Sequence, residues 1–327
     1  MKKRSILAAA VAAPLLLLAG AGQGGAQEVE IPPGADLLPY SEQSGRMTVP
    51  VTINGSGPYN FLVDTGSERT IISRELAGSL QLGAGPKTRM HSLTGTNKVA
   101  TVIIPKLELS RRTMKKIAAP ALAQAHIGAS GMLGIDSLKS QHIVFDFASK
   151  RMALTPSRAD TKPDRDEIVV VARTMLGRLV LADAAVHGSR VVVILDTGAE
   201  VSMGNDALRQ KLMRMRKLRD AVPIRLVSIT GAEIPADHTS IGRITIGGLR
   251  VTDMAVAFGN VQLFDELGLR DRPAILLGMD VLSQFERVAV DFANREVRFL
   301  LPKPGQPKSL AAMSAVPGLE SSLLLKQ

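Results

Sequence analysis

The chain has 327 residues, enough for two domains, and with 45% hydrophobic and 21% charged residues it has the composition of a globular protein with a buried core. Aromatic residues make up only 3%, so we expect a core of Val, Ile, Leu, Ala and Met. The absence of cysteine excludes disulfide bonds, thiolate metal sites and a cysteine nucleophile.

The first 26 residues have the pattern of a secretory signal peptide. Lys2, Lys3 and Arg4 precede an Ala- and Leu-rich apolar stretch at 6–19, and small residues at 24–26 offer a cleavage site. The apolar stretch is shorter than the roughly 20 residues of a membrane-spanning helix. We therefore expect bacterial export, to the periplasm or as a secreted protein, without stable membrane insertion after cleavage. Retention of the segment as an uncleaved anchor stays open.

Four sequence elements occur twice in the same order, which indicates a duplicated domain. The spacing between the two copies grows slowly along the chain, as expected if loops were inserted after the duplication. The paired elements are 61–68 with 193–200, 92–95 with 228–231, 132–136 with 276–280, and 144–148 with 289–293.

A polar, charged segment at 157–167 contains Pro163, has no apolar periodicity, and is predicted to be a linker. It separates an N-terminal lobe at 27–156 from a C-terminal lobe at 168–301. Residues 302–327 form a tail to which we assign no structure.

Short β-rich runs dominate both halves. Each half is predicted to begin with a strand, a turn and an apolar strand, at 47–53, 54–58 and 59–63 and again at 179–186, 187–189 and 190–195. Later in each half a Thr-Gly pair between extended runs predicts a hairpin tip. Brief helices are expected after each Asp-Thr-Gly and after each Leu-Gly element. The fold class is therefore mostly β, with two small closed β-barrels or sandwiches in one chain.

An Asp-Thr-Gly follows an apolar strand in each half, with its carboxylate at Asp64 and Asp196. The glycines allow a tight turn and a close approach, and the threonine hydroxyls can bond to the other lobe. If the lobes face each other about a pseudo-twofold axis, the two carboxylates meet and share one proton. One carboxylate then activates a water molecule while the other protonates a carbonyl oxygen. The supporting residues are Thr65, Gly66, Ser67, Thr197, Gly198 and Ala199.

These motifs resemble those of the retropepsin and pepsin superfamily of aspartic peptidases, over roughly residues 46–301. The resemblance rests on 64–67, 196–199 and the apolar-apolar-Gly elements 132–134 and 276–278. It implies an acid-protease fold with two retropepsin-like lobes and an aspartic endopeptidase that acts on a peptide or protein substrate without metal or cofactor. Because both lobes are in one chain, it also implies a monomer.

The resemblance also suggests substrate-binding residues. The hairpin tips would be flaps that close over the peptide, and the acidic residue four positions after each catalytic Asp would hold the substrate backbone. For these two acidic residues a structural salt bridge stays open as the alternative. The first hairpin, 89–95, lacks the flap Tyr of pepsins, and the segment before Met47 is short for a pepsin-type propeptide. The residues concerned are Thr94, Gly95, Thr230, Gly231, Glu68 and Glu200.

The motif differs between the lobes, with Ser67 after the first Asp-Thr-Gly and Ala199 after the second. In the pepsin-like resemblance the Ser hydroxyl reaches its own Asp, and a donated hydrogen bond lowers a carboxyl pKa. This predicts that Asp64 is mainly ionised and that Asp196 mainly holds the proton. The alternative is that Ser67 caps a local turn and Ala199 only packs.

The sequence leaves one alternative function open and argues against two others. A catalytically inactive peptide-binding module on the same fold stays open as the alternative. The five histidines are scattered without a metal-binding spacing, and no Gly-x-Ser-x-Gly motif occurs, which argues against a metal hydrolase and a serine hydrolase.

The repeated Asp146 and Asp291 are predicted to be structural residues at turns. The basic run 209–219 is interpreted as a helix with Leu212, Met215 and Leu218 inward; because no aromatic residue interleaves with it, no nucleic-acid partner is expected.

Overall fold

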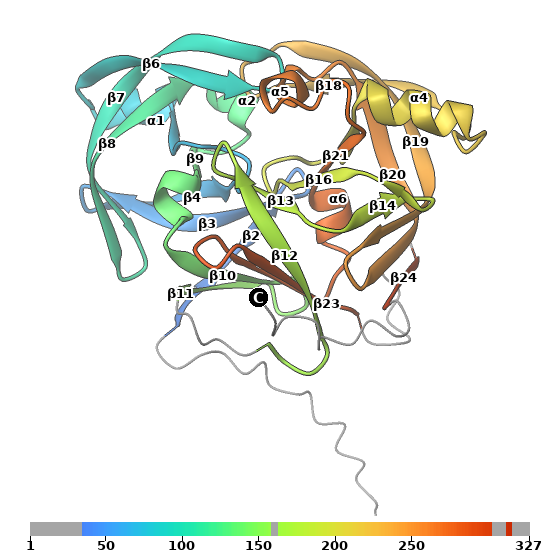
Figure 1. The fold of residues 1–327 in the computed structure, drawn as a ribbon. Coiled ribbons are helices and arrows are strands. Elements are labelled where there is room, and N and C mark those ends of the chain that lie inside the picture. The colour runs from blue at the N-terminus through green and yellow to red at the C-terminus, as the bar shows by residue number, and fades with distance from the viewer. Residues whose placement is uncertain (1–34, 158–162, 303–311, 316–327) are drawn as a thin grey trace, which may run out of the picture. The chain divides into compact units, whose positions relative to one another are not determined.

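The computed structural model describes residues 35–157, 163–302 and 312–315 (Figure 1). The predicted signal peptide lies outside the described residues, as do 158–162 of the predicted linker and most of the predicted tail. Within the described ranges, no helix is both long enough and apolar enough to span a membrane.

The structure is mostly β, as predicted. The first half contains β1 (Asp36–Pro39), β2 (Ser41–Gln43), β3 (Arg46–Ile53), β4 (Ser56–Val63), β5 (Ile71–Ser73), α1 (Arg74–Ser79), β6 (Ala84–Ser92), β7 (Gly95–Leu109), β8 (Arg112–Leu122), α2 (Gln124–Ile127), β9 (Gly131–Leu133), α3 (Ile135–Leu138), β10 (Gln141–Asp146) and β11 (Arg151–Pro156). The second half contains β12 (Glu167–Met175), β13 (Arg178–Leu181), β14 (Ala184–Val186), β15 (Ser189–Arg190), β16 (Val192–Leu195), β17 (Met203–Gly204), α4 (Asp206–Arg214), β18 (Val222–Val227), β19 (Glu233–Ile246), β20 (Leu249–Gly259), α5 (Gln262–Glu266), β21 (Ala274–Leu277), α6 (Met279–Leu282), β22 (Arg287–Asp291), β23 (Glu296–Leu300) and β24 (Ala312–Ala315).

Lobe 1 is a curled sheet in the order β2-β3-β4-β9-β5-β8-β7-β6, in which β3 also meets β7. That seam consists of two residue pairs, Thr52 with Glu108 and Ile53 with Leu107. Alternate residues of β3 point into the lobe, and Met47, Val49, Val51 and Ile53 are fully buried there. The inward row of side chains explains why the sheet curls around a core instead of lying flat.

Lobe 2 repeats this arrangement with one interruption. The predicted strand at 179–186 is divided into β13 and β14 at Asp183, whose φ of +52° breaks the extended backbone. β13 pairs with β16, and β14 pairs with β15 and β19, but β13 and β14 do not pair with each other. The closed barrels predicted from the sequence are therefore only approximated, since neither lobe is sealed by a full-length pair of strands.

A sheet that the sequence did not predict joins the two lobes. It runs β1-β11-β10-β22-β23-β12, so that the first three strands come from one half and the last three from the other. At its centre β10 pairs antiparallel with β22 from His142 to Asp146. The core beneath it includes Phe145, Phe285 and Phe299, all fully buried. The lobes thus share one hydrogen-bonded sheet and one core, which fixes their relative position around the site.

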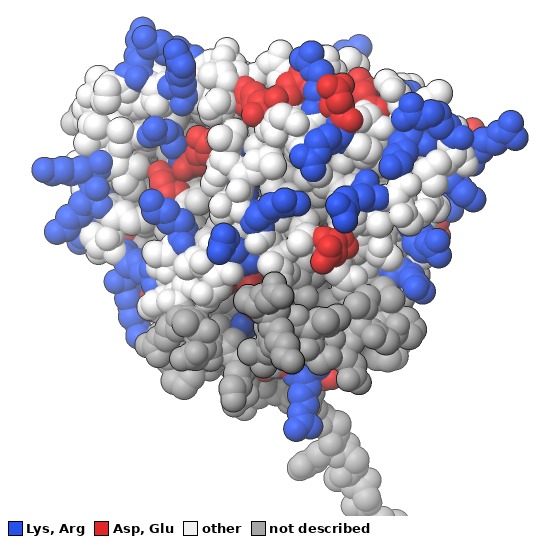
Figure 2. Space-filling view, viewed as in Figure 1, with Lys and Arg blue, Asp and Glu red and all other residues white. Residues whose placement is uncertain are grey.

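Two smaller predictions concern polar segments. Asp146 and Asp291 lie at turns, where their carboxylates accept hydrogen bonds from the backbone N–H groups of Ser149 (2.8 Å) and Asn294 (2.9 Å). In the basic run, α4 ends at Arg214 rather than continuing to residue 219. Leu208 and Leu212 are buried, whereas Met215 and Leu218 are half-buried beyond the helix end. On the face shown in Figure 2, Lys and Arg are spread over both lobes and are not confined to this run.

Candidate active site

Each lobe supplies one loop to the site, and parallel strand pairing holds both loops in place. β4 pairs with β9, and β16 pairs with β21. Where the first strand of each pair ends, the N–H of Asp64 donates to Leu133 O and the N–H of Asp196 donates to Leu277 O, both at 3.0 Å. The apolar-apolar-Gly elements found in the sequence are the strands that carry out this positioning.

Two threonines bond the loops to each other across the lobes. The N–H of Thr65 donates to the hydroxyl of Thr197, and the N–H of Thr197 donates to the hydroxyl of Thr65, both at 3.0 Å. The hydroxyl of Thr197 donates in turn to Val63 O at 2.7 Å, and that of Thr65 to Leu195 O at 3.4 Å. Both side chains are fully buried. Because each hydroxyl is used twice, neither loop can move without breaking bonds to the other.

The two glycines of the motif bring the carboxylates together. A Cβ at Gly66 would lie 2.5 and 2.6 Å from the two carboxylate oxygens of Asp196. A Cβ at Gly198 would lie 2.6 Å from Oδ1 of Asp64. Each carboxylate therefore packs directly on the glycine of the opposite lobe. Both Asp side chains are buried, with 6% and 8% of their surfaces exposed.

A cavity of 470 Å³ opens above the two carboxylates. Two β-hairpins cover it: flap 1, formed by β6 and β7, and flap 2, formed by β18 and β19. Their tips meet at the hydroxyls of Thr94 and Thr230, 3.5 Å apart. Gly95 contacts Gln262 of lobe 2, and Gly231 contacts His126 of lobe 1. Each flap thus reaches across to the opposite lobe, and the site is a roofed cleft.

Polar contacts hold flap 1 against lobe 2. Gln262 N–H donates to Leu93 O at 2.9 Å. His91 Nδ1 lies 2.7 Å from one carboxylate oxygen of Glu266, and the hydroxyl of Thr96 donates to the other at 2.5 Å. The side chains of His91 and Glu266 are 30% and 18% exposed, so both are largely shielded from solvent. These contacts form a latch between flap 1 and α5, which we call the flap latch.

Residues 49–137 and 182–281, together more than half of the chain, match a family model described as aspartyl protease. The chain belongs to the aspartyl protease family. The two matched regions fall in the two lobes, and each contains one Asp-Thr-Gly, so the resemblance inferred from the sequence is confirmed. No curated protein matches the chain at a significant level.

The electrostatics of this aspartyl protease differ from the sequence-based prediction. Burial raises the pKa of Asp64 well above its usual range, and the negative charge of Asp196 raises it further. Burial also raises the pKa of Asp196, but the positive charge of Arg178 opposes that effect. For Asp64 the positive charge of Arg178 also lowers the pKa, but it ranks behind burial, the charge of Asp196 and the hydrogen bonds. The environment therefore favours the proton on Asp64 and the charge on Asp196, the reverse of the prediction.

The predicted bond from the Ser67 hydroxyl to Asp64 is absent. That hydroxyl donates to Arg69 O at 2.9 Å and caps the local turn. Asp64 Oδ1 instead accepts the backbone N–H groups of Gly66 (2.7 Å) and Ser67 (2.9 Å), whereas Ala199 packs beside an apolar cluster of lobe 2. The prediction was wrong because a neighbouring carbonyl competes for the hydroxyl. Replacement of Ser67 by Ala is thus no longer expected to shift the titration of Asp64.

Two ion pairs bridge the lobes beside the aspartates of this protease. Arg178 of lobe 2 lies 3.5 Å from Glu68 of lobe 1, and Arg46 of lobe 1 lies 3.2 Å from Glu200 of lobe 2. Both arginine side chains are buried and line the cavity. Glu68 and Glu200 thus form the salt bridges that were the alternative to substrate binding. Glu200 also lines the cavity, with 47% of its side chain exposed.

A second pair of carboxylates anchors the two Asp-Thr-Gly loops from behind. Asp136 accepts hydrogen bonds from the N–H (2.9 Å) and hydroxyl (2.8 Å) of Thr70. In lobe 2, Asp280 accepts from the N–H (2.9 Å) and hydroxyl (2.6 Å) of Ser202. Burial raises the pKa of Asp280. These bonds tie α3 and α6 to the segment that follows each Asp-Thr-Gly.

The predicted site residues take part in this cleft to different degrees. Both aspartates, both motif glycines and Glu200 line it, and the flap tips meet at Thr94 and Thr230. Glu68 does not line the cavity and is connected to it through its ion pair with Arg178. Sequence reasoning missed Arg46 and Arg178, although both follow a Gly and stand 132 residues apart, the same spacing as the two aspartates. In the described parts of the chain, no three His, Asp or Glu side chains gather closely enough to hold a metal ion.

Proposed function

We propose that this aspartyl protease family member is an active aspartic endopeptidase with Asp64 and Asp196 as its catalytic dyad. The observation that carries the proposal is the direct packing of each buried carboxylate on the glycine of the opposite Asp-Thr-Gly. A fold that had lost catalysis would have no need to bury two carboxyl groups against each other, because each such burial is costly unless one proton is shared.

The chemistry follows from the unequal environments of the two carboxyl groups. Asp196, whose pKa is raised by burial but lowered by the charge of Arg178, is the partner that accepts a proton from a water molecule held between the carboxyl groups. Asp64, which burial keeps protonated, donates a hydrogen bond to the carbonyl oxygen of the scissile peptide bond. Water attacks the carbonyl carbon, the proton on Asp196 passes to the leaving amine, and no covalent intermediate with the enzyme forms. The dyad titrates as a unit, so only its apparent pKa values can be measured.

The cleft supports a peptide or protein as the substrate. It is open at the sides, covered by two flaps and lined by apolar side chains such as Leu93, Leu226 and Ile229. The flap-tip residues Thr94, Gly95, Thr230 and Gly231 would contact the peptide backbone after the flaps open and close again. Glu200 would contact it at the edge of the cleft.

We further propose that the enzyme acts as a monomer after export from a bacterial cell. A single chain supplies both carboxylates, so no second copy is needed to complete the dyad. Specific activity should stay constant on dilution into the nanomolar range. Export is supported by the basic and apolar pattern of residues 1–26.

The test is cleavage of a random peptide library, read by mass spectrometry, with the wild-type protein and with Asp64→Asn and Asp196→Asn. Each single variant should lose turnover while remaining folded, and the double variant should be no worse than either. Asp183→Asn is the matched control, because Asp183 is exposed and has a positive φ that Asn tolerates. Appreciable cleavage by either dyad variant would contradict the assignment. Peptide binding without cleavage by the wild type would identify an inactive peptide-binding module.

A further inference from the structure

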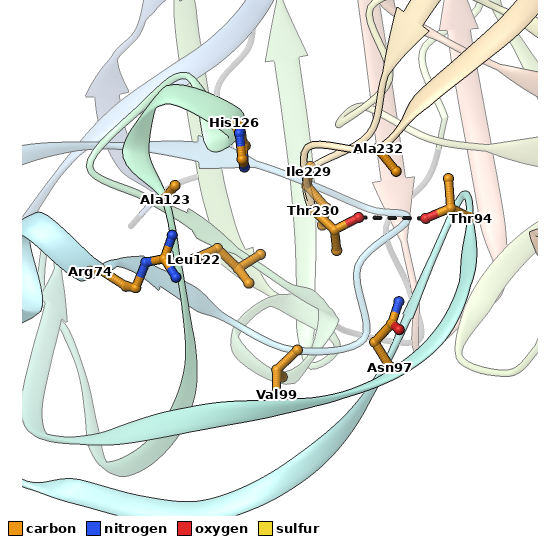
Figure 3. A pocket seen from close by; sticks show the side chains of 10 residues that line it. All are labelled: Arg74, Thr94, Asn97, Val99, Leu122, Ala123, His126, Ile229, Thr230 and Ala232. Atoms are coloured by element: carbon orange, nitrogen blue, oxygen red, sulfur yellow. Dashed lines mark hydrogen bonds between the residues drawn. The ribbon is translucent and has the colours of Figure 1, made fainter.

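A second cavity, of 560 Å³, lies beside the cleft of the dyad. His126 and Ile229 line both cavities, so a peptide that lies over the dyad passes the second one. We call it the Arg74 cavity (Figure 3). Its walls come from lobe 1 and from the tips of both flaps: Arg74, Thr94, Asn97, Val99, Leu122, Ala123, His126, Ile229, Thr230 and Ala232.

Arg74 brings an uncompensated positive charge to this cavity. It is the first residue of α1, directly after the N-cap Ser73, and its side chain is exposed. Figure 3 shows its guanidinium beside Leu122 and Ala123, with the imidazole of His126 on the same side of the cavity. Within the described residues, Arg74 makes no side-chain hydrogen bond and no ion pair.

Glu75, the residue that follows Arg74, does not form an ion pair with it. Glu75 lies outside the cavity lining, and its carboxylate accepts a hydrogen bond from the backbone N–H of Gln124 at 2.9 Å. The pKa of Glu75 is lowered mainly by backbone hydrogen bonds, and the charges of Arg74 and His126 contribute least. A carboxylate that enters the cavity therefore finds a guanidinium with its donors free.

The corresponding position in lobe 2 has the opposite charge. Asp206, the first residue of α4 after the N-cap Asn205, stands where lobe 1 has Arg74. The two lobes are otherwise arranged alike here: Gln262 of lobe 2 contacts Gly95 at the tip of flap 1, and His126 of lobe 1 contacts Gly231 at the tip of flap 2. The duplicated lobes thus differ in charge at the first residue of this helix, with Arg74 in lobe 1 and Asp206 in lobe 2.

We propose that the Arg74 cavity is a subsite for an acidic side chain, so that the substrates are peptides with Glu or Asp at one position close to the scissile bond. The inference rests on the proposed peptidase function and names its substrate class. Arg74 would form a charge-assisted hydrogen bond with the carboxylate. Val99 and Leu122 would contact the methylene groups of the side chain, which favours Glu over Asp.

The test compares matched peptides that differ by Glu or Gln at the position enriched in a library digest. The wild type should cleave the Glu peptide about tenfold faster in kcat/KM, and the ratio should fall as salt rises, because the cavity is open to solvent. Arg74→Gln should bring the ratio of the Glu peptide to the Gln peptide close to one, and Arg74→Lys should keep most of the preference for Glu. Arg74→Glu should instead cleave a third matched peptide, with Lys at this position, faster than the Glu peptide. Arg190→Gln, the same charge change at an exposed position of β15, should leave the ratio unchanged.

Binding of the same labelled peptides to Asp64→Asn, measured by fluorescence anisotropy, separates this inference from the proposed function. Tighter binding of the Glu peptide that is lost in the Asp64→Asn, Arg74→Gln double variant supports the subsite, even if no protein cleaves. Cleavage with the same rate and affinity for Glu and Gln peptides would overturn the subsite and leave the peptidase intact. Absence of both cleavage and charge-dependent binding would overturn both.

Discussion

Replacing Gly66 with Ala places a methyl group where the carboxylate of Asp196 now lies. The new Cβ would stand 2.5 Å from a carboxylate oxygen, whereas ordinary contact begins at 3.4 Å. The carboxylate must therefore move by about 1 Å, and a displacement of that size costs on the order of 100-fold in rate. Because the methyl group intrudes into a buried site, we expect a loss of about 1–3 kcal/mol in unfolding free energy.

The assay is kcat/KM on a peptide from the library digest, together with thermal unfolding of the same preparations. Gly198→Ala should behave similarly, because its Cβ would meet Asp64 in the same way. Gly78→Ala is the control: it lies in α1 with no heavy atom within 4 Å of the added methyl, so it should leave activity unchanged and stabilise slightly. Folded Gly66→Ala protein with kcat/KM within fivefold of the wild type would refute the view that glycine packing sets the carboxylate geometry.

Two further predictions concern the acid limb and the roof of the cleft. Arg178→Gln removes the positive charge that lowers the pKa of Asp196, so this pKa should rise and the acid limb of the plot of kcat/KM against pH should move to higher pH. The controls Arg178→Lys and Ser67→Ala should leave that limb near its original position. An unmoved acid limb in folded Arg178→Gln would contradict the assignment of the charge to Asp196. Glu266→Ala removes the side chain that His91 and Thr96 contact in the flap latch and leaves the bond from Gln262 to Leu93 in place. We expect roughly tenfold faster hydrogen exchange at the tip of flap 1 with no change at the tip of flap 2. Equal exchange in the variant and the wild type would show that these contacts do not hold the flap.

The sequence was sufficient for those parts of the site that depend on local pattern. An apolar strand followed by Asp-Thr-Gly, present twice, predicted the carboxylates at Asp64 and Asp196 and the hydroxyls that reach across at Thr65 and Thr197. It also predicted the hairpin tips, because a Thr-Gly pair between extended runs is a turn signal that does not depend on distant residues.

Features that depend on distant partners were not predicted. The sheet between the lobes requires β10 and β22 to pair although they lie far apart in the chain, and no local pattern gives that register. Arg46 and Arg178 look like ordinary basic residues until the fold places each beside the glutamate of the other lobe. Ser67 failed for a different reason, since the choice between two nearby acceptors depends on turn geometry that composition does not encode.

The shared sheet also determines when activity can arise during folding. Its central pair joins strands separated by more than 140 residues, and contacts of such long range form late, after the local hairpins of each lobe. A chain that has folded only its first lobe presents a single carboxylate in a half-built cleft, which cannot share a proton or hold the attacking water. We therefore expect the proposed hydrolytic activity to be one of the last properties that the molecule acquires, so that a partly folded chain would not digest its neighbours.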